Sequence, residues 1–196
     1  MIEAKTIDKI FKALERQIGV HGGSPFSIVV CGGTALAALD LVLRTTRDVD
    51  VLGEVVLEKQ KIKIKKIDCF PQWFIGASEV VRRDFGLTKY WIDTGPTFQV
   101  ESGLPEGFEE RLVRKKYGKY LTVYFISRID QIHFKLFASL DRGGYHIDDL
   151  FNLNPSIDEI LKAAKWVLTR DNSMEFKTKL HDFLEKKELH EIIGRI

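Results

Sequence analysis

A short apolar segment that runs directly into two glycines is the feature that most constrains this chain. The segment Phe26–Cys31 is mostly apolar and rich in β-branched residues, so it predicts a buried strand that ends at Gly32 and Gly33. The next residues, 34–43, have high helix propensity and predict a helix. Glycine lets an anion approach the backbone, and the start of a helix favours negative charge. The order strand, glycine turn and helix therefore predicts a phosphate-binding turn.

Two aspartates follow this helix at a spacing of two residues. Asp48 and Asp50 belong to a second predicted strand, in which side chains alternate, so both carboxylates lie on one face about 6–7 Å apart. Two carboxylates in this position can share one divalent ion or bridge two, and Mg²⁺ prefers oxygen ligands. A lone Gly-Gly is usually a turn and a lone Asp-x-Asp is usually surface charge. Their combination in this order predicts a nucleotide site with a metal ion.

The two motifs together resemble a known family. Gly32-Gly33-Thr34, followed by Arg47-Asp48-Val49-Asp50, is similar to the DNA polymerase β-like nucleotidyltransferase superfamily, in the branch related to the abortive-infection toxins of type IV toxin–antitoxin systems. The resemblance extends over most of the chain, from about Phe26 to Phe183, and includes segments 103–112, 127–136 and 146–150. It implies an α/β (α+β) nucleotidyltransferase fold with a small mixed sheet flanked by helices, followed by a C-terminal helical subdomain.

The resemblance also implies roles for individual residues. The metal ion, Mg²⁺ or Mn²⁺, would be bound by Asp48 and Asp50, and the superfamily's third carboxylate corresponds to either Asp93 or Asp68. The expected nucleotide-binding residues are Gly32, Gly33, Thr34 and Arg47. A lysine and a later aspartate that function in the toxin-like relatives correspond to Lys135 and to Asp148 or Asp149. Without the resemblance, a lysine at a helix flank is usually solvated, and acids in a first helical turn usually favour the helix dipole.

The activity implied is metal-dependent transfer of an NMP group from an NTP to an acceptor hydroxyl. The acceptor is expected to be an RNA 3′ end, such as that of a tRNA, or a protein side chain, and a cognate antitoxin is a further expected partner. The alternative is a catalytically degenerate protein of the same fold that serves as a nucleotide-binding or interaction module. A dinucleotide-binding dehydrogenase and a P-loop kinase are disfavoured, because neither G-x-G-x-x-G nor a Gly-Lys-Ser/Thr element is present.

Length and composition agree with a compact enzyme domain. With 196 residues, of which 44% are hydrophobic, the chain can bury a substantial core. We expect a nucleotidyltransferase core at residues 1–126 and a helical subdomain at 127–196, packed together as one compact unit. The net charge of +2 is too small to indicate nucleic-acid binding, so such a partner would need a local basic patch. The chain shows no signal peptide and no apolar run of membrane-spanning length, so we expect a cytoplasmic protein without a membrane partner.

Four smaller features complete the predictions. Apolar residues at helical spacing predict an N-terminal helix that ends before Gly22. Alternating lysine and isoleucine at residues 59–66 predict an edge strand with a basic face, more simply explained by protection against aggregation than by RNA contact. Ser156 and Glu159 form a capping-box pattern at the start of a late helix. Both cysteines are predicted to be reduced thiols in the core, at Cys31 and Cys69.

Overall fold

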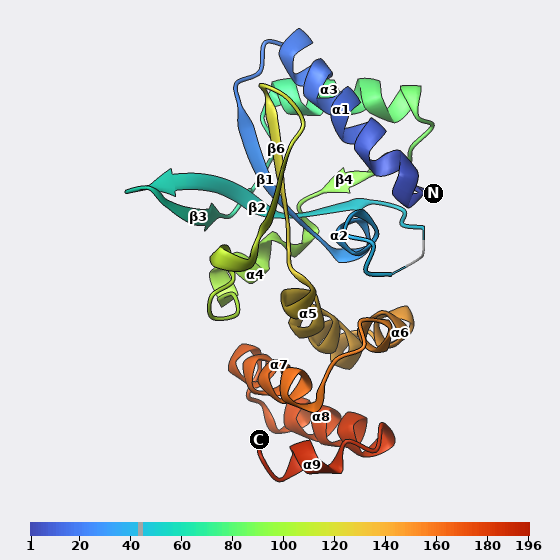
Figure 1. Ribbon diagram of the computed structural model, residues 1–196, viewed down its shortest axis with the longest axis vertical. Helices are drawn as coiled ribbons and strands as arrows, with labels where there is room; N and C mark the ends of the chain where they lie inside the picture. Colours follow the sequence, from blue (N-terminus) through green and yellow to red (C-terminus); the bar gives the residue numbers. More distant parts are fainter. Residues whose placement is uncertain (43–44) are drawn as a thin grey trace. The chain divides into compact units, whose positions relative to one another are not determined.

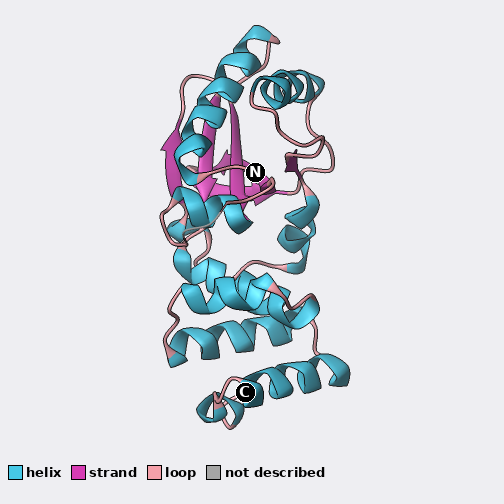
Figure 2. Ribbon diagram, turned by 90° about the vertical axis from the view of Figure 1, so that its right-hand side faces the viewer, coloured by secondary structure: helices cyan, strands magenta, loops and turns pink. Residues whose placement is uncertain are grey.

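The protein has a mixed α/β architecture, seen in a computed structural model that describes residues 1–42 and 45–196. The chain divides into two compact units, Met1–Ser127 and Arg128–Ile196. The first unit contains the sheet and several helices, and the second contains helices (Figures 1 and 2). The predicted combination of a mixed sheet with flanking helices is therefore confirmed. No helix in the described ranges is both long and apolar enough to cross a membrane.

A six-stranded sheet forms the centre of the N-terminal unit. Its strands follow the order β3-β2-β1-β6-β5, and β4 also pairs with β2. Strand β1 is parallel to β6 and antiparallel to β2, and β4 is parallel to β2. Antiparallel pairing also joins β2 to β3 and β5 to β6. The strand bounds are β1 Phe26–Cys31, β2 Val49–Glu58, β3 Lys61–Lys65, β4 Ile92–Asp93, β5 Val113–Lys116 and β6 Leu121–Phe125.

Two long helices cover the sheet because each presents an apolar side to it. In α1 (Ala4–Val20) the buried side includes Phe11, whose ring lies 6.1 Å from that of Phe125 on β6. Helix α3 (Gln72–Asp84) lies beside α1 (Figure 1) and buries Phe74, whose ring lies 5.4 Å from that of Phe26 on β1. The remaining helical segments of this unit are α2 Gly32–Ala38, η1 Gly95–Thr97, α4 Phe98–Ser102 and η2 Glu109–Arg111.

The helix after the glycine turn is shorter than predicted. It spans Gly32–Ala38, although high helix propensity continues to residue 43, which lies outside the described residues. Asp40 adopts a left-handed backbone with φ of 52°. The Asp40 N–H bonds to the carbonyl of Ala37 and the Leu41 N–H to that of Leu36, which is the Schellman pattern of a helix end. Aspartate tolerates this conformation better than most residues do, so a helix-ending signal was present but weak.

Two further sequence predictions are confirmed, and one, for a cysteine, is wrong. Strand β3 is an edge strand whose lysines are exposed, as the alternating pattern predicts. Helix α1 ends at Val20, ahead of Gly22, which is also as predicted. The prediction for Cys69 is wrong, because this residue is exposed in the loop between β3 and α3, whereas Cys31 is buried at the end of β1. Apolar neighbours in the sequence do not bury a side chain that lies in a connecting loop.

The C-terminal unit consists of helices and short connections. Its helices are α5 Arg128–Asp141, α6 Tyr145–Asn152, α7 Ile157–Arg170, α8 Met174–Lys186 and α9 His190–Ile193. Trp166 of α7 stacks on Phe134 of α5 at 5.6 Å between ring centroids and is 9% exposed, so it is a core residue. Both hydrogen bonds of the predicted capping box are present. The Ser156 hydroxyl accepts the Glu159 N–H, and the Glu159 carboxylate accepts the Ser156 N–H.

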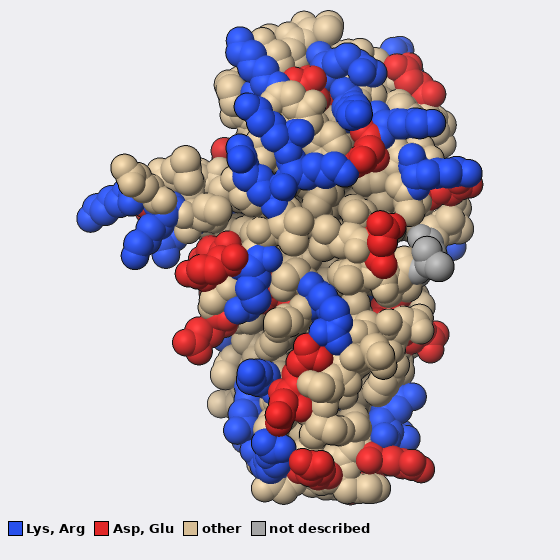
Figure 3. All heavy atoms as spheres, viewed as in Figure 1, with Lys and Arg blue, Asp and Glu red and all other residues tan. Residues whose placement is uncertain are grey.

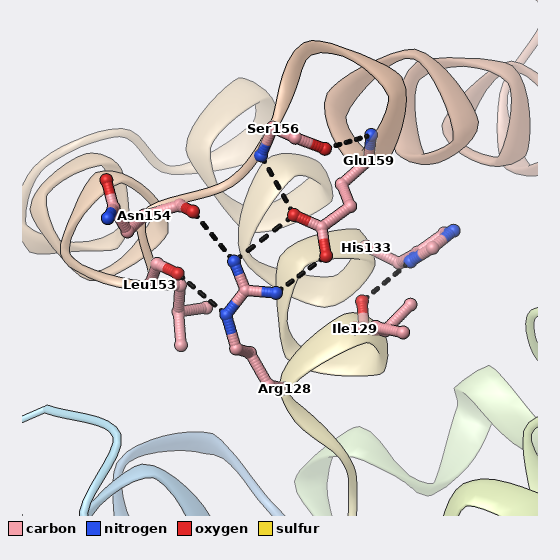
Figure 4. Close-up of polar contacts among 7 residues, drawn as sticks. All are labelled: Arg128, Ile129, His133, Leu153, Asn154, Ser156 and Glu159. Carbon is pink, nitrogen blue, oxygen red and sulfur yellow. Dashed lines mark hydrogen bonds and ion pairs between the residues drawn. The ribbon is translucent and has the colours of Figure 1, made fainter.

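Arg128 connects the first turn of α5 to the start of α7 (Figure 4). Its guanidinium donates to both carboxylate oxygens of Glu159, at 2.6 and 3.2 Å, and to the backbone carbonyls of Leu153 and Asn154. Glu159 also accepts the Ser156 N–H of the capping box. The Arg128 guanidinium lowers the pKa of Glu159, against the opposing effect of burial. One carboxylate thus serves both a helix cap and a bidentate ion pair.

We predict that Glu159→Gln lowers the free energy of unfolding at neutral pH by about 1 kcal/mol, the scale of a capping interaction plus a partly screened ion pair. Because the pKa of Glu159 is depressed in the folded state, its contribution is present above the ordinary value of 4.5 and is lost as the pH falls below it. Urea unfolding at a series of pH values measures the difference between variant and parent. Glu175→Gln, which breaks an exposed pair with Lys179, is the control and should have little effect. A difference that grows in acid would contradict this account.

Candidate metal centre

Three aspartates from two neighbouring strands meet at one end of the sheet. Asp48 precedes β2, Asp50 lies in β2 and Asp93 ends β4. Each offers one carboxylate oxygen, and these oxygens lie within 4.8 Å of one another. All three side chains are half-buried. Within the described residues, these aspartates form the one group of at least three His, Cys, Asp or Glu side chains that lie close enough together to hold a metal ion.

Strand pairing brings these residues together. Cys31, the last residue of β1, is opposite Asp50 in the antiparallel β1–β2 pair, and Asp50 is opposite Asp93 in the parallel β2–β4 pair. The glycine turn follows Cys31 directly, so it lies at the same end of the sheet as the aspartates. The strand β4 is only two residues long, yet its register places the Asp93 carboxylate beside a residue 43 positions earlier.

Two threonine hydroxyls fix the backbone at Asp48. Thr34, in α2, donates to the carbonyl oxygen of Asp48 at 2.6 Å, and Thr46 donates to the same oxygen at 3.2 Å. The Thr46 hydroxyl is also 3.5 Å from Oδ1 of Asp48. Both threonines are buried, so their hydroxyls hold Asp48 in a region with little solvent. The first residues of α2 are thereby tied to the strand that carries the carboxylates.

Asp93 is oriented by a backbone donor. The N–H of Gly95 donates to its Oδ1 at 2.7 Å, which is an Asx-type turn. A hydrogen bond to one carboxylate oxygen fixes the direction of the other, as donors around a metal site commonly do. The side chain therefore has a defined orientation before any ion is bound.

Gly32 permits a close approach between the turn and Asp50. Its φ is +64°, which other residues rarely adopt, and a Cβ at this position would collide with the carboxylate oxygen Oδ2 of Asp50. The absence of a side chain at residue 32 thus serves two purposes. It allows the left-handed turn, and it leaves space for the Asp50 carboxylate directly over the backbone.

The arrangement suits a hard divalent cation. Carboxylate oxygens are the ligands that Mg²⁺ and Mn²⁺ prefer, and Mg²⁺–oxygen distances of about 2.1 Å place opposite ligands about 4.2 Å apart. Oxygens that lie within 4.8 Å of one another need only a small inward rotation to meet this requirement, or they can bridge two ions. Three carboxylates at this spacing repel one another, so a cation would also relieve their mutual repulsion.

The other residues predicted for this site occupy varied positions. Gly33 and Thr34 are buried in the first turn of α2, and Arg47 is exposed beside Asp48. Asp68, the alternative third carboxylate, lies outside the aspartate group and forms an exposed ion pair with Lys66 at 3.1 Å. The structure therefore brings Asp93, and not Asp68, to Asp48 and Asp50.

Lys135 and Asp149 form a buried ion pair in the C-terminal unit. Their Nζ and Oδ2 atoms are 2.7 Å apart, and the two residues are 4% and 2% exposed. The ammonium also lies 5.8 Å from the centroid of the Tyr145 ring. Asp148 is exposed, since α6 turns it away from the side that carries Asp149. Of the two candidate acids, Asp149 is the partner of Lys135, and Lys135 is not a solvated lysine.

Two residues at the centre were not predicted from the sequence, namely Thr46 and Gly95. Thr46 stands two residues before Asp48, a common position for a hydroxyl that bonds to nearby backbone. The Asp93-Thr94-Gly95 segment has the composition of an Asx turn. Both signals are frequent in proteins, and only the position of these residues beside the aspartates gives them a role here.

We predict that Gly32→Ala weakens Mn²⁺ binding by about tenfold or more, the usual scale for disturbing residues that support a metal ligand. The added Cβ would displace the Asp50 carboxylate. Gly22→Ala is a matched control, because Gly22 also has a positive φ, of +69°, but faces open space. Both variants carry a similar backbone strain of about 1–2 kcal/mol. Isothermal titration calorimetry with MnCl₂ measures the affinity, and equal affinities in the two variants would rule out the proposed contact.

Comparisons with known proteins add no relative. Neither the protein-family models, nor the curated proteins, nor the solved structures include a match to this chain.

Proposed function

We propose that this protein is a metal-dependent nucleotidyltransferase that moves an NMP group from an NTP to an acceptor hydroxyl. The observation that supports the proposal is the grouping of Asp48, Asp50 and Asp93 next to a glycine turn that opens a helix. Phosphoryl chemistry of this kind requires little covalent participation by the protein. It depends instead on positioning and on compensation of negative charge, which these elements are suited to provide.

The carboxylates of Asp48, Asp50 and Asp93 would hold the cations that the proposed reaction needs. When bound, Mg²⁺ or Mn²⁺ would neutralise charge on the phosphates and lower the pKa of the acceptor hydroxyl. Asp50 and Asp93 are adjacent across the β2–β4 pair, and the Gly95 N–H limits the rotation of Asp93. The hydroxyls of Thr34 and Thr46 fix the backbone at Asp48. This degree of preorganisation favours a site that does not need to rearrange before reaction.

The turn at Gly32 and Gly33 is the proposed phosphate-binding element. The first N–H groups of a helix have no intrahelical acceptor, and glycine at residue 32 leaves the backbone open to an approaching anion. The hydroxyl of Thr34 donates to the Asp48 carbonyl, so this residue is better suited to joining the turn to the aspartates than to direct phosphate contact. Arg47 is exposed beside Asp48 and can contribute positive charge toward a nucleotide.

Lys135 is proposed to support the transition-state charge, as the family resemblance implies. Asp149 fixes the position of the Lys135 ammonium through the 2.7 Å pair. Asp149 is therefore proposed as a positioning residue. The exposed Asp148 has no role in this proposal.

A binding module without turnover is the second candidate. It is favoured by the Thr34 hydroxyl, which is engaged with backbone and not turned toward a ligand. The two candidates differ in one observable outcome, because a binding module would bind Mg²⁺ and NTP without releasing pyrophosphate.

The test is incubation with each of the four labelled NTPs, Mg²⁺ or Mn²⁺, and separate total RNA and total protein fractions. Transfer predicts pyrophosphate release together with label in one of these fractions. Nucleotide binding without either signal would support the binding module. Absence of both nucleotide binding and metal binding would overturn both candidates.

We predict that Asp48→Asn and Asp50→Asn each weaken binding of MgATP while the fold is retained. Removal of one of three mutually repelling charges should also leave the metal-free protein equally stable or slightly more stable. Calorimetry measures the affinity and thermal melts measure the stability. Asp68→Asn is the control, since it makes the same chemical change at the candidate acid that lies outside the group. Unchanged MgATP affinity in both variants would place the site elsewhere.

A test of Lys135 requires a variant in which a loss of turnover cannot be caused by unfolding. Lys135→Ala alone would remove one charge of a buried ion pair, at a cost of about 3–5 kcal/mol, and could abolish activity through unfolding. Replacing both charges together, as Lys135→Met with Asp149→Leu, should be nearly neutral for stability. We predict that this double variant lowers turnover by about a hundredfold or more, while Asp148→Asn changes little. A stable double variant with full turnover would remove the pair from the mechanism.

A further inference from the structure

Lysine and arginine side chains gather on one face of the N-terminal unit. Figure 3 shows them over α1 and the β5–β6 hairpin. Segments 1–20 and 111–126, which contain these elements, carry nine basic and three acidic residues. The whole chain has 30 basic and 28 acidic residues, so positive charge is concentrated on this face and the rest of the chain is net acidic.

Four of these cations form a stripe along the exposed side of α1. They occupy positions i, i+4, i+7 and i+11, which lie on one side of a helix, whereas the opposite side is buried in the core. At 1.5 Å per residue, the stripe is about 16 Å long. The residues of this α1 stripe are Lys5, Lys9, Lys12 and Arg16, and all four are exposed.

The acids of α1 are turned away from the stripe and bind the hairpin. Asp8 accepts hydrogen bonds from Lys115 and Tyr117, both at 2.8 Å. Burial opposes ionisation of Asp8, but these two bonds, together with the charges of Lys115 and Lys12, outweigh it and lower the pKa of Asp8. Burial and the Asp8 carboxylate raise the pKa of Tyr117. Glu15 accepts the backbone N–H of Tyr120 at 3.2 Å. Both acids therefore hold the hairpin against α1, and of the four stripe cations only Lys12 lies near enough to Asp8 to affect its charge.

Most of the surface cations have no acidic partner. Across residues 1–42 and 45–196, no ion pair involves Lys9, Lys12 or Arg16, and the same is true of Lys116 and Lys119 in the hairpin. Lys5 is paired with Glu3 at the start of the helix. Like charges three or four residues apart destabilise a helix slightly, so the stripe does not serve the stability of α1. A partner of opposite charge would compensate it.

We propose that the α1 stripe, together with Lys116 and Lys119, binds the phosphate backbone of a nucleic acid. Such backbones carry one phosphate per about 3.4 Å of each strand, so the stripe spans about five phosphates. Exposed lysine and arginine side chains make this type of contact through charge, without reading the bases. The interaction is independent of sequence and strongly dependent on salt.

The aromatic and apolar residues of this face argue for phosphate contacts and against other partners. The Tyr117 hydroxyl is bound to Asp8, and the Tyr120 ring packs on Gly19, so neither ring is a free platform for stacked bases. A helix that binds a membrane surface needs large apolar side chains beside its cations. Apart from Val20 at its last position, the large apolar side chains of α1 are on the buried side, so a lipid surface is disfavoured.

The stripe begins next to the segment that carries the metal centre. Ile2 pairs with Thr46 through two backbone hydrogen bonds, of 2.6 and 3.0 Å, and Thr46 stands two residues before Asp48. A nucleic acid along α1 would thus have one end near the aspartates, where an acceptor hydroxyl is required. This placement of the acceptor rests on the proposed function, whereas the binding itself does not.

The test measures fluorescence anisotropy of a labelled RNA of about 20 nucleotides, and a DNA of the same sequence, in EDTA at several salt concentrations. We expect Lys9→Glu/Lys12→Glu/Arg16→Glu to lower the affinity by at least tenfold and to reduce the slope of log K against log salt by about 2–3. Equal binding of RNA and DNA, or a preference for RNA, fits the proposal. Asp48→Asn/Asp50→Asn removes negative charge and should bind at least as tightly as the parent does, which separates this result from any failure of nucleotidyl transfer.

The control variant is Lys162→Glu/Lys165→Glu/Lys177→Glu, which changes the net charge equally at exposed cations of the C-terminal unit. We expect its affinity to stay within about twofold of the parent, since it lacks the phosphate-contacting residues. Equal losses in the two triple variants, or no binding by the parent at low salt, would overturn the proposal. Binding to phosphatidylserine vesicles without binding to either oligonucleotide would also overturn it. Thermal melts confirm that each variant is folded.

Discussion

Mutual repulsion of three carboxylates is the constraint on which the N-terminal unit depends. Oxygens of Asp48, Asp50 and Asp93 within 4.8 Å of one another are unfavourable without a cation, so the fold must hold them together. It does so with rigid parts. The β1–β2 and β2–β4 registers fix the backbone, Gly32 leaves space for Asp50, and buried hydroxyls hold the strand at Asp48. A site that holds three carboxylates this close together is suited to binding a cation, because the cation would offset their repulsion.

Negative and positive charges gather on different parts of the N-terminal unit. The aspartate group lies at one end of the sheet, while exposed cations line the outer side of α1 and the β5–β6 hairpin. The acids of α1 do not disturb this separation, because Asp8 and Glu15 are engaged by the hairpin. A low net charge therefore conceals two regions of opposite sign. Such a distribution suits binding of cations at the aspartates and of polyanions on the basic face.

The C-terminal unit shows two different uses of ion pairs. Arg128 and Glu159 form a partly exposed, bidentate pair that also completes a helix cap, and this pair explains how α5 and α7 are joined. Lys135 and Asp149 form a buried pair, which is costly to desolvate and contributes little net stability. A buried charge pair of this kind is easier to explain by function than by folding. The proposed role for Lys135 is consistent with that cost.

The local elements could be read from the sequence because they depend on local patterns. The strand before Gly32, the helix α1, the edge strand β3 and the capping box at Ser156 follow from periodicity, glycine placement and side-chain chemistry. The same patterns placed Asp48 and Asp50 on one face, although they extended the helix α2 too far and placed Cys69 in the core.

Only the tertiary structure could choose Asp93 over Asp68 and Asp149 over Asp148. Each choice depends on strand register or helix rotation, which are set by packing between residues far apart in the chain. The roles of Thr46 and Gly95, and the turning of Asp8 and Glu15 away from the α1 stripe, depend on the same long-range packing. The sequence by itself determined which residues could serve as metal ligands, namely Asp48, Asp50 and a choice between two further aspartates. Long-range pairing decided which of them meet, because no local pattern encodes a contact between distant segments.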